Sequence, residues 1–189
     1  LSDARFEARL CRQAVEDEGP WACGGYPMVD FTEAARWAGA NLEAGTPVLS
    51  RKPRIWYLMS GIPSRTFPFT EEPGVLRREA RALGARLVVL DFIGDAAVLY
   101  VGSDLVAAPQ AYCSLGGFGG GPGLPPTRIL GILGPGQVSG TRIGESAIDL
   151  APCPPSFGPG VEPGGSPSRG GAGGDRSPAD RRRWTIPLL

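Results

Sequence analysis

Hydrophobic positions alternate between helical spacing and short continuous runs over the first 133 residues. Apolar residues at helical spacing predict a helix over residues 31–44, with Asp30 as its cap, Glu33 completing a capping box and Gly45 ending it. The apolar run 46–51 then predicts a short buried strand. These elements form a helix followed by a strand across a tight connection.

A second helix and strand follow directly. The run of consecutive apolar residues 55–59 suits either a short buried helix or a strand. Pro53 at a first helical position and Gly61 just past the end favour the helix. Alternating aromatic residues over 65–69 predict another strand, which Pro68 confines to a sheet edge or a strand end.

The clearest helix lies between Glu71 and Gly84. Acidic residues and Pro73 favour its start, an apolar stripe follows at helical spacing, and the glycine stops it. Three arginines on its other side predict a solvated surface rather than a nucleic-acid stripe: Arg77, Arg78 and Arg81.

The remaining pattern completes an α/β fold. The continuous apolar run 87–91 predicts a strand covered on both faces, whereas 96–108 is ambiguous because Gly102 weakens it as a helix. Two last strands and the glycine-rich loop joining them are expected at 111–115, 127–133 and 116–123. We therefore predict a small, mostly parallel sheet of about four to five strands with helices packed on it.

Composition changes toward the C-terminus. Residues 116–189 contain 19 Gly and 12 Pro, against 10 Gly and 8 Pro in residues 1–115. A segment with so few large apolar groups cannot bury enough surface to offset chain entropy. The expected organisation is a lead-in (1–29), an α/β domain (30–133) and a disordered low-complexity tail (134–189).

Charge and residue types exclude several kinds of site. The net charge is zero, so no nucleic-acid partner is expected, and the absence of histidine removes the commonest general base and metal ligand. The four cysteines have no zinc-site spacing, so neither a metal nor a cofactor is predicted. Cys11 and Cys23 could form a bridge in an oxidising compartment, but nothing in the sequence fixes their separation and free thiols are favoured.

The strongest candidate site follows the strand 46–51. Arg51, Lys52 and Arg54 come after its carboxyl end, where open α/β sheets build ligand crevices, and three cations there would suit a phosphate or a carboxylate. Asp91, at the end of a later strand, is either a counterion for them or a turn residue. The candidate ligand-binding residues are Arg51, Lys52, Arg54, Tyr57 and Asp91.

The cations after the strand have a simpler explanation, and two other kinds of site are disfavoured. Arg51 and Lys52 would be ordinary exposed turn residues if Trp56 and Tyr57 pack in the core. The loop 116–123 is rich in glycine but comes late and leads to prolines, which disfavours phosphate binding. No catalytic residue is predicted, because Ser50, Ser60 and Ser64 have no histidine to activate them.

One stretch resembles a known family. Residues 31–92 contain an Ala-Ala-Arg-Trp helix, a strand ending Val-Leu-Ser, then Arg-Lys-Pro-Arg-x-x-Tyr-Leu-x-Ser-Gly, Phe-Pro-Phe-Thr and Leu-Val-Val-Leu-Asp. This order resembles the soluble C-terminal region of bacterial membrane glycosyltransferases related to protein O-mannosyltransferases and the lipid A aminoarabinose transferase. The carrying motif is Ser50-Arg51-Lys52-Pro53 with Tyr57 and Gly61.

The resemblance implies a noncatalytic domain on the extracytoplasmic (periplasmic) side of the cytoplasmic membrane. Its partners would be the transmembrane portion of the same polypeptide, a polyprenyl-phosphate sugar and the acceptor. The catalytic acidic residue of that family lies between early membrane helices, so no residue here inherits the role. The isolated chain is expected to be inactive, and a freestanding α/β module that binds an anionic ligand through Arg51, Lys52 and Arg54 is the alternative.

Overall fold

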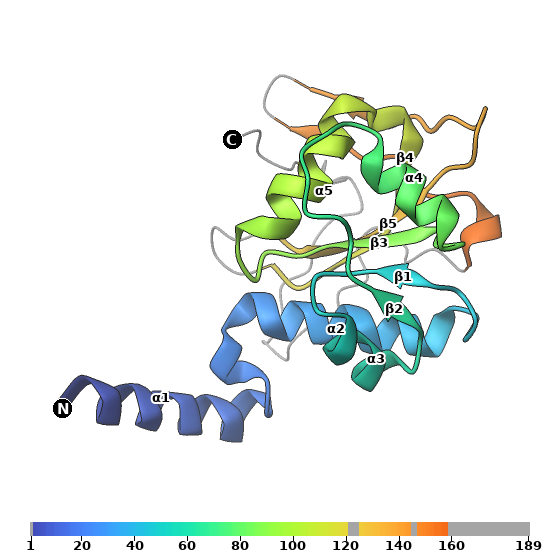
Figure 1. The fold of residues 1–189 in the computed structure, drawn as a ribbon. Coiled ribbons are helices and arrows are strands. Elements are labelled where there is room, and N and C mark those ends of the chain that lie inside the picture. The colour runs from blue at the N-terminus through green and yellow to red at the C-terminus, as the bar shows by residue number, and fades with distance from the viewer. Residues whose placement is uncertain (1, 121–124, 145–146, 159–189) are drawn as a thin grey trace, which may run out of the picture.

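A five-stranded sheet between two layers of helices organises the chain (Figure 1). The computed structural model describes residues 2–120, 125–144 and 147–158. Their helices are α1 (Ser2–Glu18), α2 (Tyr26–Asn41), α3 (Pro53–Ser60), α4 (Val75–Ala82) and α5 (Asp95–Ala107), with short 3-10 turns η1 (Ala22–Gly24), η2 (Pro109–Ala111) and η3 (Pro155–Phe157). Their strands are β1 (Val48–Leu49), β2 (Ser64–Arg65), β3 (Leu87–Leu90), β4 (Tyr112–Phe118), β5 (Thr127–Ile132), β6 (Arg142–Ile143) and β7 (Ile148–Asp149).

The sheet has the strand order β2-β1-β3-β5-β4. β1 pairs in parallel with β2 and β3, whereas β5 runs antiparallel to β3 and β4. The predicted α/β fold is confirmed. The sheet is mixed because β4 and β5 are antiparallel neighbours, while the strands linked through α3 and α4 are parallel.

Each face of the sheet has its own helices. In Figure 1, α2 and α3 lie below the sheet, and α4 and α5 lie above it. Val88 and Leu90 of β3 belong to the core beneath α4 and α5, whereas Leu87 and Val89 belong to the core against α2 and α3. β3 is therefore buried on both faces, as its continuous apolar run predicts.

α2 begins earlier than predicted, and Asp30 lies inside it. Gly25 precedes the helix and Pro27 stands in its first turn, a position where a missing N–H costs nothing. Asp30 is only 4 % exposed, and its carboxylate accepts a hydrogen bond from the backbone N–H of Gly120 at 3.0 Å. The capping-box prediction is wrong because a contact distant in sequence, not the helix start, determines the position of Asp30.

α3 has the predicted limits. It begins at Pro53 and ends before Gly61, whose φ of +70° is the left-handed conformation that glycine adopts readily. Trp56 is fully buried and meets Phe31 edge to face, with 5.6 Å between ring centroids. Tyr57 does not join this core, since it is 58 % exposed.

α4 contains a half-buried cation that is paired within the fold. Nε of Arg77 lies 2.9 Å from the carboxylate of Asp104, whose side chain is almost fully buried. The same carboxylate accepts hydrogen bonds from the Tyr112 hydroxyl and the backbone N–H of Gly74. The solvated-surface prediction is therefore wrong for Arg77, which ties α4 to α5.

The ambiguous segment after residue 95 is a helix. Ala97, Val101 and Leu105 of α5 recur at four-residue intervals and are all buried. Their packing offsets the roughly 1 kcal/mol that Gly102 costs in a helix interior relative to alanine.

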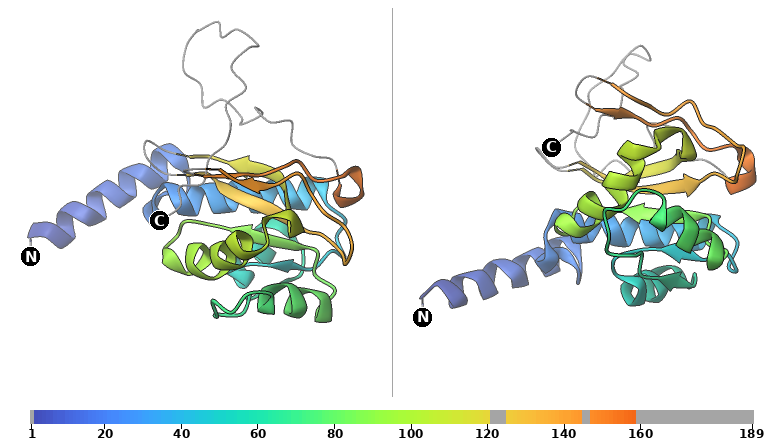
Figure 2. Two further views of the ribbon diagram at one scale, coloured as in Figure 1. Left: turned by 90° about the horizontal axis from the view of Figure 1, so that it is seen from above. Right: turned by 45° about the horizontal axis from the view of Figure 1, so that its top comes forward.

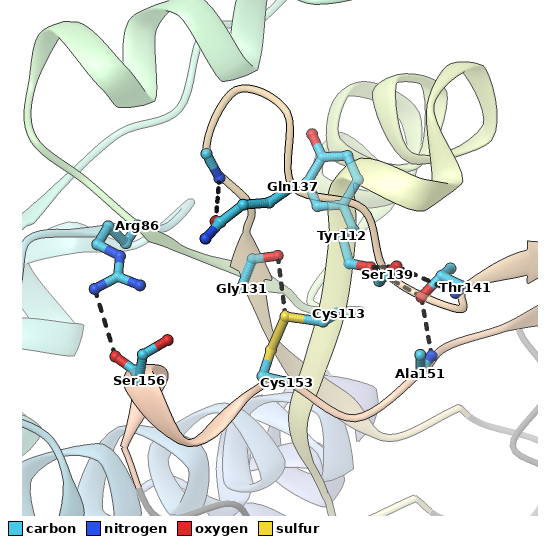
Figure 3. The surroundings of a disulfide bond; sticks show 11 residues. Arg86, Tyr112, Cys113, Gly131, Gln137, Ser139, Thr141, Ala151, Cys153 and Ser156 are labelled. Carbon is cyan, nitrogen blue, oxygen red and sulfur yellow. Dashed lines mark hydrogen bonds between the residues drawn. A yellow bond between two sulfur atoms is a disulfide. The ribbon is translucent and has the colours of Figure 1, made fainter.

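Part of the predicted tail belongs to the domain. Ser114 of β4 exchanges backbone hydrogen bonds with Ala151 and Cys153, at 2.8 and 2.9 Å. The hydroxyls of Ser139 and Thr141 both donate to the backbone carbonyl of Tyr112 (Figure 3). Residues 134–144 and 147–158 thus extend the fold, because distant partners hold a segment whose own apolar content is low. The rest of the predicted tail, 159–189, lies outside the described residues.

All four cysteines form disulfides. Cys113 of β4 is joined to Cys153 (Figure 3), and Cys11 of α1 is joined to Cys23 of η1. α1 extends away from the rest of the structure (Figure 2), and the second bridge joins the middle of this helix to η1. The prediction of free thiols is wrong because the pairings depend on folding back of the chain, which cysteine spacing does not reveal.

Candidate functional site

The predicted ligand-binding residues lie in two places. Arg51, Lys52 and Asp91 stand at the carboxyl edge of the sheet, directly after β1 and β3. Arg54 and Tyr57 belong to α3 and line a groove beside the edge strand β2. The cations that are adjacent in sequence therefore face different surroundings.

The carboxyl edge between β1 and β3 is where this topology favours a ligand. From β1 the chain passes through α3 to β2, and from β3 it passes through α5 to the strands on the opposite side. The order of strands reverses at this point, and open α/β sheets bind ligands in the crevice so formed.

Arg51 is engaged within the protein at this edge. Its Nη1 donates a hydrogen bond to the backbone carbonyl of Ile93 at 2.7 Å, which joins the end of β1 to the loop before α5. Gly94 lies alongside, with φ of +143°, and a Cβ at that position would sit 3.3 Å from Nη1 of Arg51. The guanidinium therefore holds the loop after β3 in place.

Asp91 supplies the opposite charge. It is fully buried, and Oδ1 accepts the backbone N–H of Ile93 at 3.1 Å, while Oδ2 has no hydrogen bond to any described residue. Burial raises the pKa of Asp91, and the N–H of Ile93 and the positive charges of Arg51 and Lys52 oppose this rise. The charges of Arg51 and Lys52 thus act on the Asp91 carboxylate, and the hydrogen bond from Ile93 is the contact expected of a turn residue at this position.

A buried cation lies at the start of β5, beside the end of β3 at the same edge of the sheet. Arg128 is 4 % exposed and lies opposite Leu90, the residue before Asp91. Burial lowers the pKa of Arg128 to about 10, so the guanidinium stays protonated at neutral pH. The sequence contains no local signal for this residue, because a single arginine within an apolar strand looks like an outward-facing position.

The three serines that the sequence offered as nucleophiles are engaged with other groups. Oγ of Ser50 lies 3.1 Å from Oγ of Ser64, which in turn bonds the carbonyl of Val48. Oγ of Ser60 donates to the carbonyl of Trp56. Without any histidine in the sequence, none of these hydroxyls has the neighbouring base that a serine nucleophile requires.

The second place is an open groove that we call the α3–β2 groove. Its volume is 760 Å³, and its lining residues are Pro53, Arg54, Tyr57, Pro63, Ser64, Arg65, Thr66 and Leu83. Arg65 and Leu83 were not among the predicted residues. They come from an edge strand and the end of α4, so only the folded chain brings them beside α3.

Other kinds of site lack a basis in the described part of the chain. No group of three or more His, Cys, Asp or Glu side chains gathers there as a metal ion would need. Within the same residues, every helix is too short or too polar to cross a bilayer.

Comparisons with models of protein families, with curated proteins and with solved structures found no match to this chain.

Proposed function

We propose that this chain is a noncatalytic extracytoplasmic domain of a polytopic membrane glycosyltransferase that uses a polyprenyl-phosphate sugar. The proposal starts from the motif Ser50-Arg51-Lys52-Pro53 with Tyr57 and Gly61. In that family the reaction takes place in the membrane portion, and this domain would contribute to the acceptor or donor side.

The observation that carries the proposal is what the motif residues do. Arg51 binds the loop after β3, Pro53 begins α3, and Gly61 ends that helix in a left-handed conformation. Residues with such roles mark a fold, and they are expected in a domain whose chemistry takes place elsewhere in the polypeptide.

The two disulfides support the compartment. Disulfides persist in oxidising environments such as the bacterial periplasm and are rare in the cytosol. Cys113–Cys153 also joins β4 to the C-terminal segment, so the domain gains from an oxidising compartment.

Two experiments test the proposal. The coding sequence upstream of Leu1 should encode several apolar segments of about 20 residues, and their absence would reject the membrane assignment. In intact cells, a membrane-impermeant maleimide should modify Cys11 and Cys23 only after reduction, since Cys23 is exposed and both are held in a disulfide. Modification without reductant, once the cells have been permeabilised, would instead place the domain in a reducing compartment.

A further inference from the structure

We propose that the α3–β2 groove binds an organic phosphate, that is, a phosphate group attached to a ring or an alkyl moiety. The proposal does not rest on the membrane assignment, because every residue that it uses belongs to α3, the end of α4, or β2 and its flanks. In Figure 1, α3 and β2 lie together at one edge of the sheet, and β4 is the strand at the opposite edge.

Two unpartnered cations line the groove. The side chains of Arg54 and Arg65 are exposed, and neither forms a hydrogen bond or an ion pair with any residue whose side chain is described. Arg51 and Arg77, in contrast, are engaged within the fold. The two guanidinium groups thus retain all of their donors for an external anion.

The charge of the groove favours phosphate. A phosphate monoester carries between one and two negative charges at neutral pH, which two arginines can match. The planar guanidinium fork donates two parallel hydrogen bonds to phosphate oxygens, so the pair provides both charge and geometry.

The walls of the groove suit a ring or an alkyl chain. Pro53 and Pro63 provide rigid apolar surface, the ring of Tyr57 is 58 % exposed, and Leu83 is 41 % exposed. Pockets of about 300 to 1,000 Å³ with apolar walls and a few polar groups are typical of small-molecule sites, and 760 Å³ lies in that range.

Calorimetric titration of the full chain tests the groove with four probes. These are phenyl phosphate, glucose 1-phosphate, inorganic phosphate, and phosphatidic acid in phosphatidylcholine vesicles. We expect Arg54→Ala and Arg65→Ala each to weaken binding of the organic phosphates about tenfold or more, because a charged hydrogen bond is lost. Tyr57→Ala should weaken binding of phenyl phosphate but leave that of inorganic phosphate unchanged.

The matched control removes the same charge elsewhere. Arg12→Ala and Arg142→Ala, each made alone, delete one exposed arginine in α1 or in β6 and should leave binding unchanged. Binding of vesicles alone, lost in the two groove variants, would assign the phosphate to a lipid headgroup, whereas binding of the soluble probes would assign it to a free metabolite. Absence of binding by every probe, or equal losses in the control and groove variants, would overturn the proposal.

Discussion

The carboxyl edge of the sheet and the α3–β2 groove each contain a cation from the stretch 51–54, but only the cation at the edge is hydrogen-bonded within the fold. At the edge, Arg51 bonds the carbonyl of Ile93 and lies near the buried carboxylate of Asp91. In the groove, Arg54 remains exposed and without a partner among the described side chains. The difference shows that charges that are adjacent in sequence need not form one site, because the fold engages one of them and leaves the other exposed.

The largest loss in the free energy of unfolding should come from removing the buried carboxylate of Asp104. This loss shows how much a fully engaged charge contributes in this fold. Asp104→Ala removes the acceptor of Arg77, Tyr112 and Gly74 together. Breaking such a buried pair should lower the free energy of unfolding by about 3 kcal/mol, measured by urea denaturation. Asp95→Ala, at an exposed position of α5, is the control and should cost less than about 1 kcal/mol. Equal costs would mean that the interior network contributes little.

A smaller effect should follow from crowding the loop that Arg51 holds. Gly94→Ala places a methyl group 3.3 Å from Nη1 of Arg51, at a φ of +143° that L residues rarely adopt. We expect a loss of about 1 to 3 kcal/mol in the free energy of unfolding. In a double-mutant cycle with Arg51→Ala, the combined loss should fall below the sum of the single losses, since the steric part disappears. If the two losses simply add, the cost of Gly94→Ala does not arise from contact with Arg51.

The stability of the carboxyl edge should depend on pH through the buried carboxylate of Asp91. Because burial raises the pKa of Asp91 above its unfolded value, the folded protein binds this proton more tightly than the unfolded chain does. The charged carboxylate therefore destabilises the fold above the folded pKa, and this penalty fades as the pH falls through it. Asp91→Asn should be more stable than the parent at pH 8, with a difference that shrinks toward pH 4. Denaturation across this range, with Asp95→Asn as control, measures it. Lower stability of the variant at pH 8 would mean that attraction to Arg51 and Lys52 exceeds the cost of burial.

The smallest effect on stability belongs to the groove. Arg65→Ala should change the free energy of unfolding by no more than about 0.5 kcal/mol, because the side chain is exposed and has no partner among the described side chains. Thermal unfolding without ligand measures this. A loss above about 1 kcal/mol would show that Arg65 supports β2 rather than remaining available to a ligand.

The sequence predicted those elements whose signals are local. Pro53 and Gly61 delimit α3, and the apolar run of β3 marks a strand buried on both faces. The parts that sequence could not predict depend on distant partners. Asp30 contacts Gly120, and the segment around Cys153 is held by β4, so neither helix spacing nor composition could reveal them.

For the candidate site, the sequence predicted where residues lie but not which of them are engaged. Position after a strand placed Arg51 and Asp91 at one edge, as the topology requires. Whether a cation is engaged is a separate matter, because Ile93 lies 42 residues from Arg51 and no spacing rule connects them. Arg65 lines the groove because β2 packs beside α3, and the sequence pattern does not predict this packing.

The most direct measurement compares Arg51→Ala with Arg54→Ala by urea denaturation at pH 7. Both variants lose one arginine from the same short stretch, so their net charge is identical. We expect Arg51→Ala to lower the free energy of unfolding by about 2 kcal/mol, the usual contribution of a hydrogen bond to a charged group, and Arg54→Ala to change it by less than about 0.5 kcal/mol. Equal losses in the two variants would contradict the division between a cation that is hydrogen-bonded within the fold and an exposed cation without a partner among the described side chains.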